Sequence, residues 1–216
     1  MASFFDFGVF LQFEMGNDNY YNKVLDNALS VLARGGTILY PTDTIWGIGC
    51  DATNEDAVEK IYALKERDHS KSMLVLCGDL DMVERIVGRV GDCVQQLLMS
   101  GDRPTTVILP IGDCDRSLRL HNSLAGNLMA ADGTIGVRIP RMDFCRRLLA
   151  LFGSPVVSTS ANFSGRPSPK SFGDIDPELI MGVDYCVPAC FEQPSDGRGS
   201  KILKINSDGK LITIRE

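Results

Sequence analysis

The spacing of hydrophobic and polar positions predicts helices that alternate with short strands. Apolar residues recur three and four positions apart, as on one face of a helix, in the segments 22–34, 54–67, 80–88, 92–99 and 142–152. Short apolar runs, typical of buried strands, occupy 37–42, 72–77, 105–110, 134–140 and 155–159. Gly35 and Gly36 end the first helix, and we expect Asn54 to cap the second.

The end of the chain adds an antiparallel pair. Residues 201–216, KILKINSDGKLITIRE, contain two strand-like runs around Ser207, Asp208 and Gly209, which is a hairpin signal. Alternating helices and strands with such a pair predict an α/β fold with a mixed parallel and antiparallel sheet. Residues 164–200 are rich in Pro, Gly and Ser and are expected to form surface loops. Since no repeat or linker divides the chain, we predict one domain over residues 22–216.

The first residues are interpreted differently. Residues 1–21 are predicted to be an N-terminal extension that is loosely held or disordered, with Met15 and Met1 both open as the biological start. The opening MASFFDFGVFLQFE is aromatic but contains Asp6 and Glu14 and lacks a basic start, so it does not fit a signal peptide. No segment approaches the roughly 20 apolar residues that span a bilayer. We therefore expect no membrane association.

Composition and charge narrow the function. The chain has 216 residues, a net charge of −6 and a pI near 5.0, which argues against coating nucleic acid with the whole surface but leaves a local basic groove open. Its seven cysteines are scattered without a CxxC pair, and its two histidines lie far from Cys186 and Cys190. We therefore expect no zinc site and assign no metal ligands. Reduced thiols indicate a cytoplasmic protein.

Two segments offer side chains for a ligand, each with an ordinary structural alternative. In YPTDTIWGIGCD, residues 40–51, Thr42 and Thr44 follow a strand, where hydroxyls either face a crevice or cap local structure around a proline turn. In KERDHSK, residues 65–71, the three cations either complement a helix C-terminus or clamp a polyphosphate.

Three further features point the same way. Arg138 lies inside an apolar strand, so it is either solvated at a sheet edge or paired with a carboxylate or an anionic ligand. The segment SPVVSTSANFSGRPSP, residues 154–169, places hydroxyls and Asn162 at a strand end, either for turn backbone or for a ligand. A glycine loop precedes Ser200. With no catalytic triad and no Walker loop, these residues predict a site that binds a phosphorylated anion and works by positioning and charge neutralisation.

In order, YPTDTIWGIGCDA, KER, GTIGVRIP, STSANFSGRPSP and GRGSKILKI resemble the YrdC/YciO superfamily over residues 22–216. The spaced pair of Lys-x-Arg and Ser-Ala-Asn is the specific part of the likeness. The resemblance implies a twisted, open, mixed sheet flanked by helices, with a concave basic surface. It also implies a threonylcarbamoyl-AMP synthase, which forms threonylcarbamoyl-AMP and pyrophosphate from L-threonine, bicarbonate and ATP. A downstream complex would then transfer the threonylcarbamoyl group to tRNA.

The resemblance also implies roles for individual residues. The catalytic residues would be Lys65 and Arg67. L-threonine would be held by Thr44, Arg138, Ser160 and Ser200. ATP would be held by Arg67, Lys71, Thr134, Asn162, Lys170 and Arg215. Mg²⁺ would accompany the triphosphate.

Departures from the family pattern keep two alternatives open. Asp68 follows Arg67 where a proline is usual, and the segment 71–73 reads KSM, which places the chain nearer the YciO branch. One alternative is a related enzyme that acts on a carbamoyl-adenylate. The other is a YciO-type module that binds tRNA or double-stranded RNA, against which the net charge of −6 counts mildly.

Overall fold

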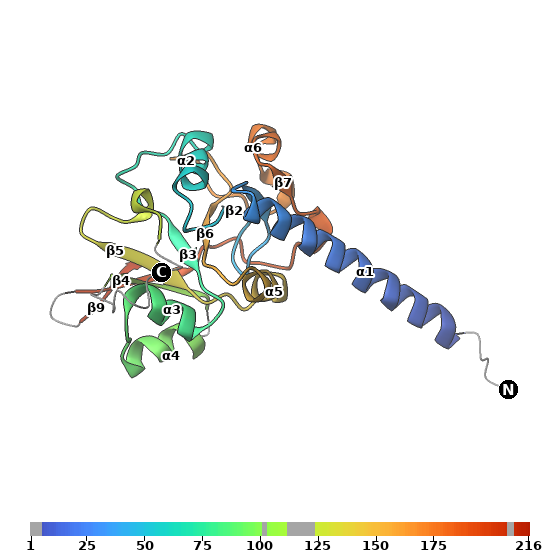
Figure 1. Ribbon diagram of the computed structural model, residues 1–216, viewed down its shortest axis with the longest axis horizontal. Helices are drawn as coiled ribbons and strands as arrows, with labels where there is room; N and C mark the ends of the chain where they lie inside the picture. Colours follow the sequence, from blue (N-terminus) through green and yellow to red (C-terminus); the bar gives the residue numbers. More distant parts are fainter. Residues whose placement is uncertain (1–5, 101–102, 112–123, 207–209) are drawn as a thin grey trace.

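The computed structural model describes residues 6–100, 103–111, 124–206 and 210–216. Within these residues the strands form one sheet in the order β7-β1-β2-β6-β3-β5-β4-β8-β9. Figure 1 shows this sheet with helices around it and one long helix, α1, that extends away from the body. The predicted hairpin turn at 207–209 lies outside the described residues.

The sheet is mixed, as predicted. Its strands are β1 (Ile38–Tyr40), β2 (Gly47–Gly49), β3 (Leu74–Leu76), β4 (Thr105–Pro110), β5 (Thr134–Arg138), β6 (Val156–Ser160), β7 (Tyr185–Cys186), β8 (Lys201–Ile205) and β9 (Leu211–Arg215). The pairs β1–β7, β3–β5 and β4–β8 are parallel. The pairs β1–β2, β2–β6, β3–β6, β4–β5 and β8–β9 are antiparallel.

The helices pack their apolar faces against the core. They are α1 (Asp6–Ala33), α2 (Glu55–Leu64), α3 (Leu80–Val87), α4 (Asp92–Ser100), α5 (Asp143–Phe152) and α6 (Pro177–Gly182), with short 3₁₀ turns η1 (Gly126–Leu128), η2 (Phe172–Asp174) and η3 (Ala189–Phe191). The predicted cap is confirmed, because the Asn54 side chain accepts a hydrogen bond from the Ala57 amide.

The first helix begins earlier than its hydrophobic pattern predicts. Val24, Leu25, Ala28 and Leu32 are buried in the core, and these positions gave the predicted start at 22. The structure continues α1 back to Asp6. Apolar periodicity marks only the part of a helix that faces a core, so it does not locate a start beyond the body. The division into an extension (1–21) and a domain (22–216) stays a prediction. No helix of the described residues is long and apolar enough to cross a membrane.

Two strands were not predicted, β2 and β7. The segment Gly47–Gly49 has too little side chain to give an apolar run, yet it lies between β1 and β6 in the sheet. A Cβ at Gly49 would contact the carbonyl oxygen of Val157 at an impossible separation and would lie 2.8 Å from Cε1 of Tyr40. The glycine therefore permits close approach of neighbouring strands.

Gly49→Ala is expected to lower the free energy of unfolding by roughly 1–3 kcal/mol, because neither backbone nor ring can move aside without strain. Gly91→Ala is the matched control, since a Cβ there meets nothing within 4 Å. Urea denaturation of both variants measures the difference. Equal midpoints for the two variants would contradict this packing argument.

Candidate active site

One face of the sheet carries a cavity of about 530 Å³. Its lining comes from the segment between β1 and β2, from the loop before β3, and from β4, β5, β6, β8 and β9. The predicted ligand residues that line it are Thr44, Arg67, Thr134, Arg138, Ser160, Ser200 and Arg215. Residues that are far apart in the sequence thus meet at one site, because adjacent strands present alternate side chains to the same face.

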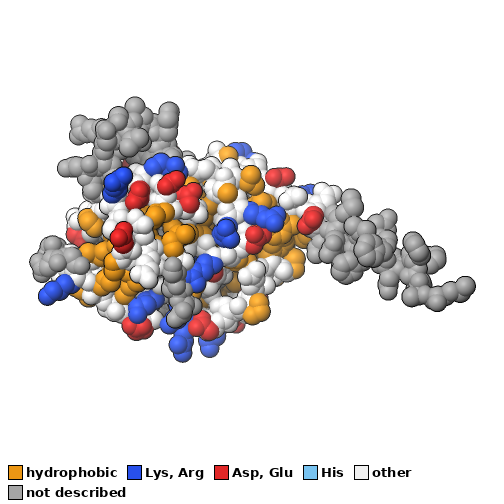
Figure 2. Space-filling model, turned by 90° about the horizontal axis from the view of Figure 1, so that it is seen from below, with side chains coloured by type: hydrophobic (Ala, Val, Ile, Leu, Met, Phe, Trp, Pro, Cys, Tyr) orange, Lys and Arg blue, Asp and Glu red, His pale blue; other side chains and the backbone are white. Residues whose placement is uncertain are grey.

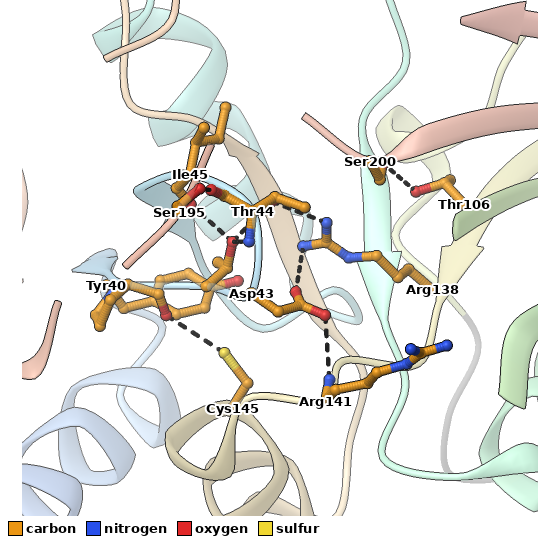
Figure 3. A network of polar contacts seen from close by, with 12 residues as sticks. Tyr40, Asp43, Thr44, Ile45, Thr106, Arg138, Arg141, Cys145, Ser195 and Ser200 are labelled. Carbon is orange, nitrogen blue, oxygen red and sulfur yellow. Dashed lines mark hydrogen bonds and ion pairs between the residues drawn. The ribbon is translucent and has the colours of Figure 1, made fainter. Parts of the chain in front are cut away.

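Arg138 is the buried charge of this cavity (Figure 3). Its side chain is 2% exposed; Nη1 donates to Thr44 Oγ1 at 3.0 Å, and Nη2 lies 3.6 Å from Asp43 Oδ1. The interpretation as a solvated edge residue is therefore wrong, and the protein carboxylate is Asp43. Arg138 Nε and Asp43 Oδ1 have no hydrogen-bond partner among the described residues. The guanidinium can therefore accept a further anionic partner such as a ligand carboxylate.

The two threonines form a directed chain of hydroxyls. Thr42 Oγ1 donates to the Ile45 carbonyl at 2.7 Å, so its single proton is used. The 2.9 Å contact between the two hydroxyls must then be a donation from Thr44 to Thr42. Thr44 Oγ1 also accepts from Arg138, which leaves one acceptor lone pair without a partner among the described residues. Both open interpretations hold: Thr42 satisfies the turn, and Thr44 faces the cavity.

Ser200, just before β8, and Arg215, at the end of β9, also line the cavity. The hydroxyls of Ser200 and Thr106 are 2.7 Å apart and buried, and Arg215 donates from Nε and Nη2 to the Ser200 carbonyl at 3.0 and 2.8 Å. Burial lowers the pKa of Arg215, and the charges of Arg138 and Arg103 act in the same direction. A cation held among other cations favours an anionic ligand. Thr106 was not predicted.

Arg67 lines the cavity from the loop that follows α2. Its Nε donates to the Lys71 carbonyl and its Nη2 to the Ser72 carbonyl, both at 2.8 Å. The turn that allows this has Glu66 in the left-handed region, with φ of 50°. Burial lowers the pKa of Arg67. The loop therefore fixes Arg67, and Lys71 takes part through its backbone.

The structure does not bring Lys65 to the cavity. Its side chain is 1% exposed, and Nζ donates to the carbonyl oxygens of Ser160 and Asn162. Burial, with the charge of Arg67, lowers the pKa of Lys65 to about 7. The three cations that were predicted to clamp a polyphosphate together therefore do not share one surface. Of Lys65, Arg67 and Lys71, only Arg67 lines the cavity. Lys65 instead fastens the end of β6 to the end of α2.

Asn162 and Lys170 line a neighbouring cavity of about 510 Å³, which shares Ser168 with the first. The Asn162 amide nitrogen donates to the carbonyls of Phe163 and Arg166 at 2.9 and 2.7 Å, whereas its Oδ1 has no partner among the described residues. These two predicted ATP residues therefore lie beside the main cavity and not in it.

A charged pair at the cavity was also missed. Lys204 Nζ lies 2.6 Å from Asp132 Oδ2, and Thr134 donates to the other oxygen at 2.6 Å. These hydrogen bonds lower the pKa of Asp132 to about 2. The period of two along β8 could have placed Lys204 on the face of Ser200. Thr134, which was predicted to bind ATP, thus donates its hydroxyl hydrogen bond to Asp132.

The described residues contain no group of three or more His, Cys, Asp or Glu that could hold a metal ion. Figure 2 shows Lys and Arg side chains interspersed with Asp and Glu around hydrophobic patches on one face of the molecule. The predicted basic character of the concave surface stays a prediction.

Comparison with known proteins identifies the family. Residues 30–216 match the Sua5/YciO/YrdC model, described as "Telomere recombination". The chain belongs to this family. A threonylcarbamoyl-AMP synthase from Xanthomonas campestris pv. campestris is 35% identical over 163 residues, covering 74% of this chain and 82% of that protein.

Solved structures of this family share the fold. P. abyssi Sua5, crystallised with L-threonine, aligns with a TM-score of 0.76 and 20% identity over 90% of this chain, which spans 54% of the Sua5 chain. E. coli YciO aligns with a TM-score of 0.71 and 23% identity, covering 90% of this chain and 89% of YciO. The predicted open, mixed sheet with flanking helices is confirmed.

Lys65→Met is expected to remove a rise of stability with pH. The pKa of Lys65 is about 7 in the folded chain against 10.5 ordinarily. Between these values the unfolded chain binds more protons, so the free energy of unfolding rises with pH, by at most about 1.4 kcal/mol per pH unit for one proton. Urea denaturation between about pH 7 and pH 9 tests this, with exposed Lys23→Met as control. Parallel curves for wild type and Lys65→Met would count against a neutral amine.

Proposed function

We propose that this chain is a threonylcarbamoyl-AMP synthase, a nucleotidyltransferase that uses L-threonine, bicarbonate and ATP. Arg138 carries the proposal. Its buried guanidinium has an Nε with no hydrogen-bond partner among the described residues, and it lies in a cavity lined by hydroxyls and further cations. The name of the 35%-identical relative supports the same activity.

L-threonine would bind with its carboxylate at Arg138, which offers donors in a fixed fork. Thr44 has a lone pair without a partner among the described residues, and it can accept from the substrate ammonium or hydroxyl. Ser160 and Ser200 supply hydroxyls on either side. A neutral amino acid thus meets one cation for its carboxylate and neutral acceptors for its amine.

ATP would bind where cations gather. Arg67, Arg215 and Thr134 line the same cavity as Arg138, and Asn162 and Lys170 line the adjoining one. Ser168 belongs to both, so a triphosphate can extend from one cavity toward the other. Mg²⁺ would enter with ATP, held by phosphate oxygens, and would neutralise their charge.

The proposed chemistry needs alignment more than acid–base groups. The threonine amine attacks the carbon of bicarbonate, and loss of water gives a carbamate. A carbamate oxygen then attacks the α-phosphorus of ATP, and pyrophosphate leaves with the bonding electrons. Fixed cations stabilise the charge that develops on the phosphate oxygens. The resulting mixed anhydride is reactive, so a tRNA-modifying transferase would consume it.

The decisive assay follows pyrophosphate release from ATP. Release should require L-threonine, bicarbonate and Mg²⁺ together, and threonylcarbamoyl-AMP should accumulate in equal amount. Release without threonine, or no release at all, would reject the synthase assignment. Binding of duplex RNA or tRNA by an inactive protein would favour the RNA-binding alternative.

Arg138→Ala should abolish threonine-dependent turnover and lower threonine affinity at least about 100-fold, because a buried charge-assisted pair and its geometry are lost. Isothermal titration with threonine measures the affinity. Arg147→Ala on α5 is the control, because Arg147 is 54% exposed and pairs with Asp143. Threonine binding that survives in Arg138→Ala would place the substrate elsewhere.

Arg67→Ala should lower kcat/KM for ATP by about 100-fold, while threonine affinity changes little. The reason is that Arg67 enters the cavity from the loop that follows α2, whereas Thr44 and Arg138 come from the turn after β1 and from β5. Steady-state kinetics with each substrate varied in turn separates the two effects. An equal loss for both substrates would show that Arg67 acts through the loop that it holds.

A further inference from the structure

A glutamate outside the main cavity joins three segments of the site. Glu192 Oε1 accepts from the Trp46 indole Nε1 at 2.7 Å and from the backbone amide of Phe172 at 2.8 Å. The rings of Trp46 and Phe172 also pack together, with centroids 4.9 Å apart. Trp46 is 2% exposed and lines the cavity, whereas Glu192 is exposed and has no cationic partner among the described residues. One carboxylate oxygen thus satisfies a buried donor from the cavity wall.

Glu192 begins a segment that continues to Ser200, which lines the cavity. We call residues 192–200 the strap. Ser195 Oγ donates to the Thr44 carbonyl (Figure 3). Gly197 lies against the Lys170 side chain, which a Cβ at Gly197 would approach to 3.0 Å. The strap ends at Ser200, whose hydroxyl meets Thr106. It is therefore fastened twice, at Glu192 and Ser195, to the segment 44–46.

Through the hydrogen bonds at Glu192 and Ser195, the Glu192 side chain can affect the distance between Thr44 and Ser200 in the cavity. Thr44 and Ser200 both line the cavity, and the strap connects the segment of one to the backbone of the other. The strap has little regular structure of its own, so its position depends on these few hydrogen bonds. Losing the acceptor at Glu192 would leave the Trp46 N–H buried and unsatisfied.

We propose that Glu192 is a positioning residue for the threonine side of the site: its carboxylate latches the strap to Trp46 and Phe172 and so fixes Thr44 relative to Ser200. This assignment rests on the proposed function for the identity of the substrate. The latch needs an acceptor oxygen and not a negative charge, since both partners are neutral N–H donors. Gln can supply that oxygen and Ala cannot.

Glu192→Ala should raise the KM and Kd for threonine about tenfold, the change expected from losing one or two ordinary hydrogen bonds. The Kd for ATP and kcat at saturating threonine should stay within about twofold. Glu192→Gln should restore the wild-type values. Glu178→Ala, which removes an exposed carboxylate from α6, is the matched control.

A second readout does not depend on the substrate. Trp46 is the only tryptophan of the chain, so its fluorescence reports on the latch alone. Acrylamide should quench Trp46 several-fold more strongly in Glu192→Ala than in wild type, Glu192→Gln or Glu178→Ala. If Glu192→Ala does not fold, Trp46→Phe, which removes the donor and keeps a ring, should weaken threonine binding in the titration instead.

The outcomes separate the two proposals. If the wild-type protein releases no pyrophosphate and binds no threonine, the proposed function is rejected. The comparison of acrylamide quenching between Glu192→Ala and wild type then tests the latch without any substrate. Unchanged quenching and unchanged threonine affinity in Glu192→Ala overturn the latch. So does a Glu192→Gln variant that behaves like Glu192→Ala, since charge would then be the property required.

Discussion

A guanidinium enclosed in a protein interior has to be compensated, and the structure around Arg138 is arranged by that requirement. The charge lies at the end of β5, between β3 and β4 in the sheet, with 2% of its surface exposed. Asp43 supplies the opposite charge from the turn after β1, and Thr44 supplies a neutral acceptor. The compensation is incomplete, because Nε has no hydrogen-bond partner in the part of the chain that the structure describes. A site that keeps a buried donor open is disposed to bind an anion there, since such a ligand removes an existing cost.

The remaining polar groups follow from this arrangement. Thr42 donates its own proton to the Ile45 carbonyl, so Thr44, which accepts from Arg138, donates its proton to Thr42. These hydrogen bonds fix the turn after β1. The Thr44 carbonyl of this turn accepts a hydrogen bond from Ser195 of the strap. Hydrogen bonds of this kind reinforce one another where water is excluded. The cavity is therefore held by a network that starts at one charge and ends in a segment near the C-terminus.

The sequence predicted those parts of the fold that depend on side-chain patterns. The amphipathic spacing of α5 and the apolar runs of β4 and β5 placed these elements within a few residues. Strands that depend on backbone packing escaped prediction, because Gly47–Gly49 lacks side chains and Tyr185–Cys186 is very short. Helix α1 was predicted only where it meets the core.

The candidate site residues were likewise predictable only where they lie in an element with a regular side-chain pattern. Arg138 was conspicuous because a charge interrupts an apolar strand, and a strand alternates its faces predictably. Lys65 was misplaced because the residues after a helix have no fixed period, and nothing local shows that its amine turns inward to the carbonyls of Ser160 and Asn162. That buried amine has its own consequence: it ties the Ser-Ala-Asn turn to the Lys-x-Arg turn. The two motifs that carried the resemblance to this family are therefore physically one unit, in which Lys65 holds the turn and Arg67 lines the cavity.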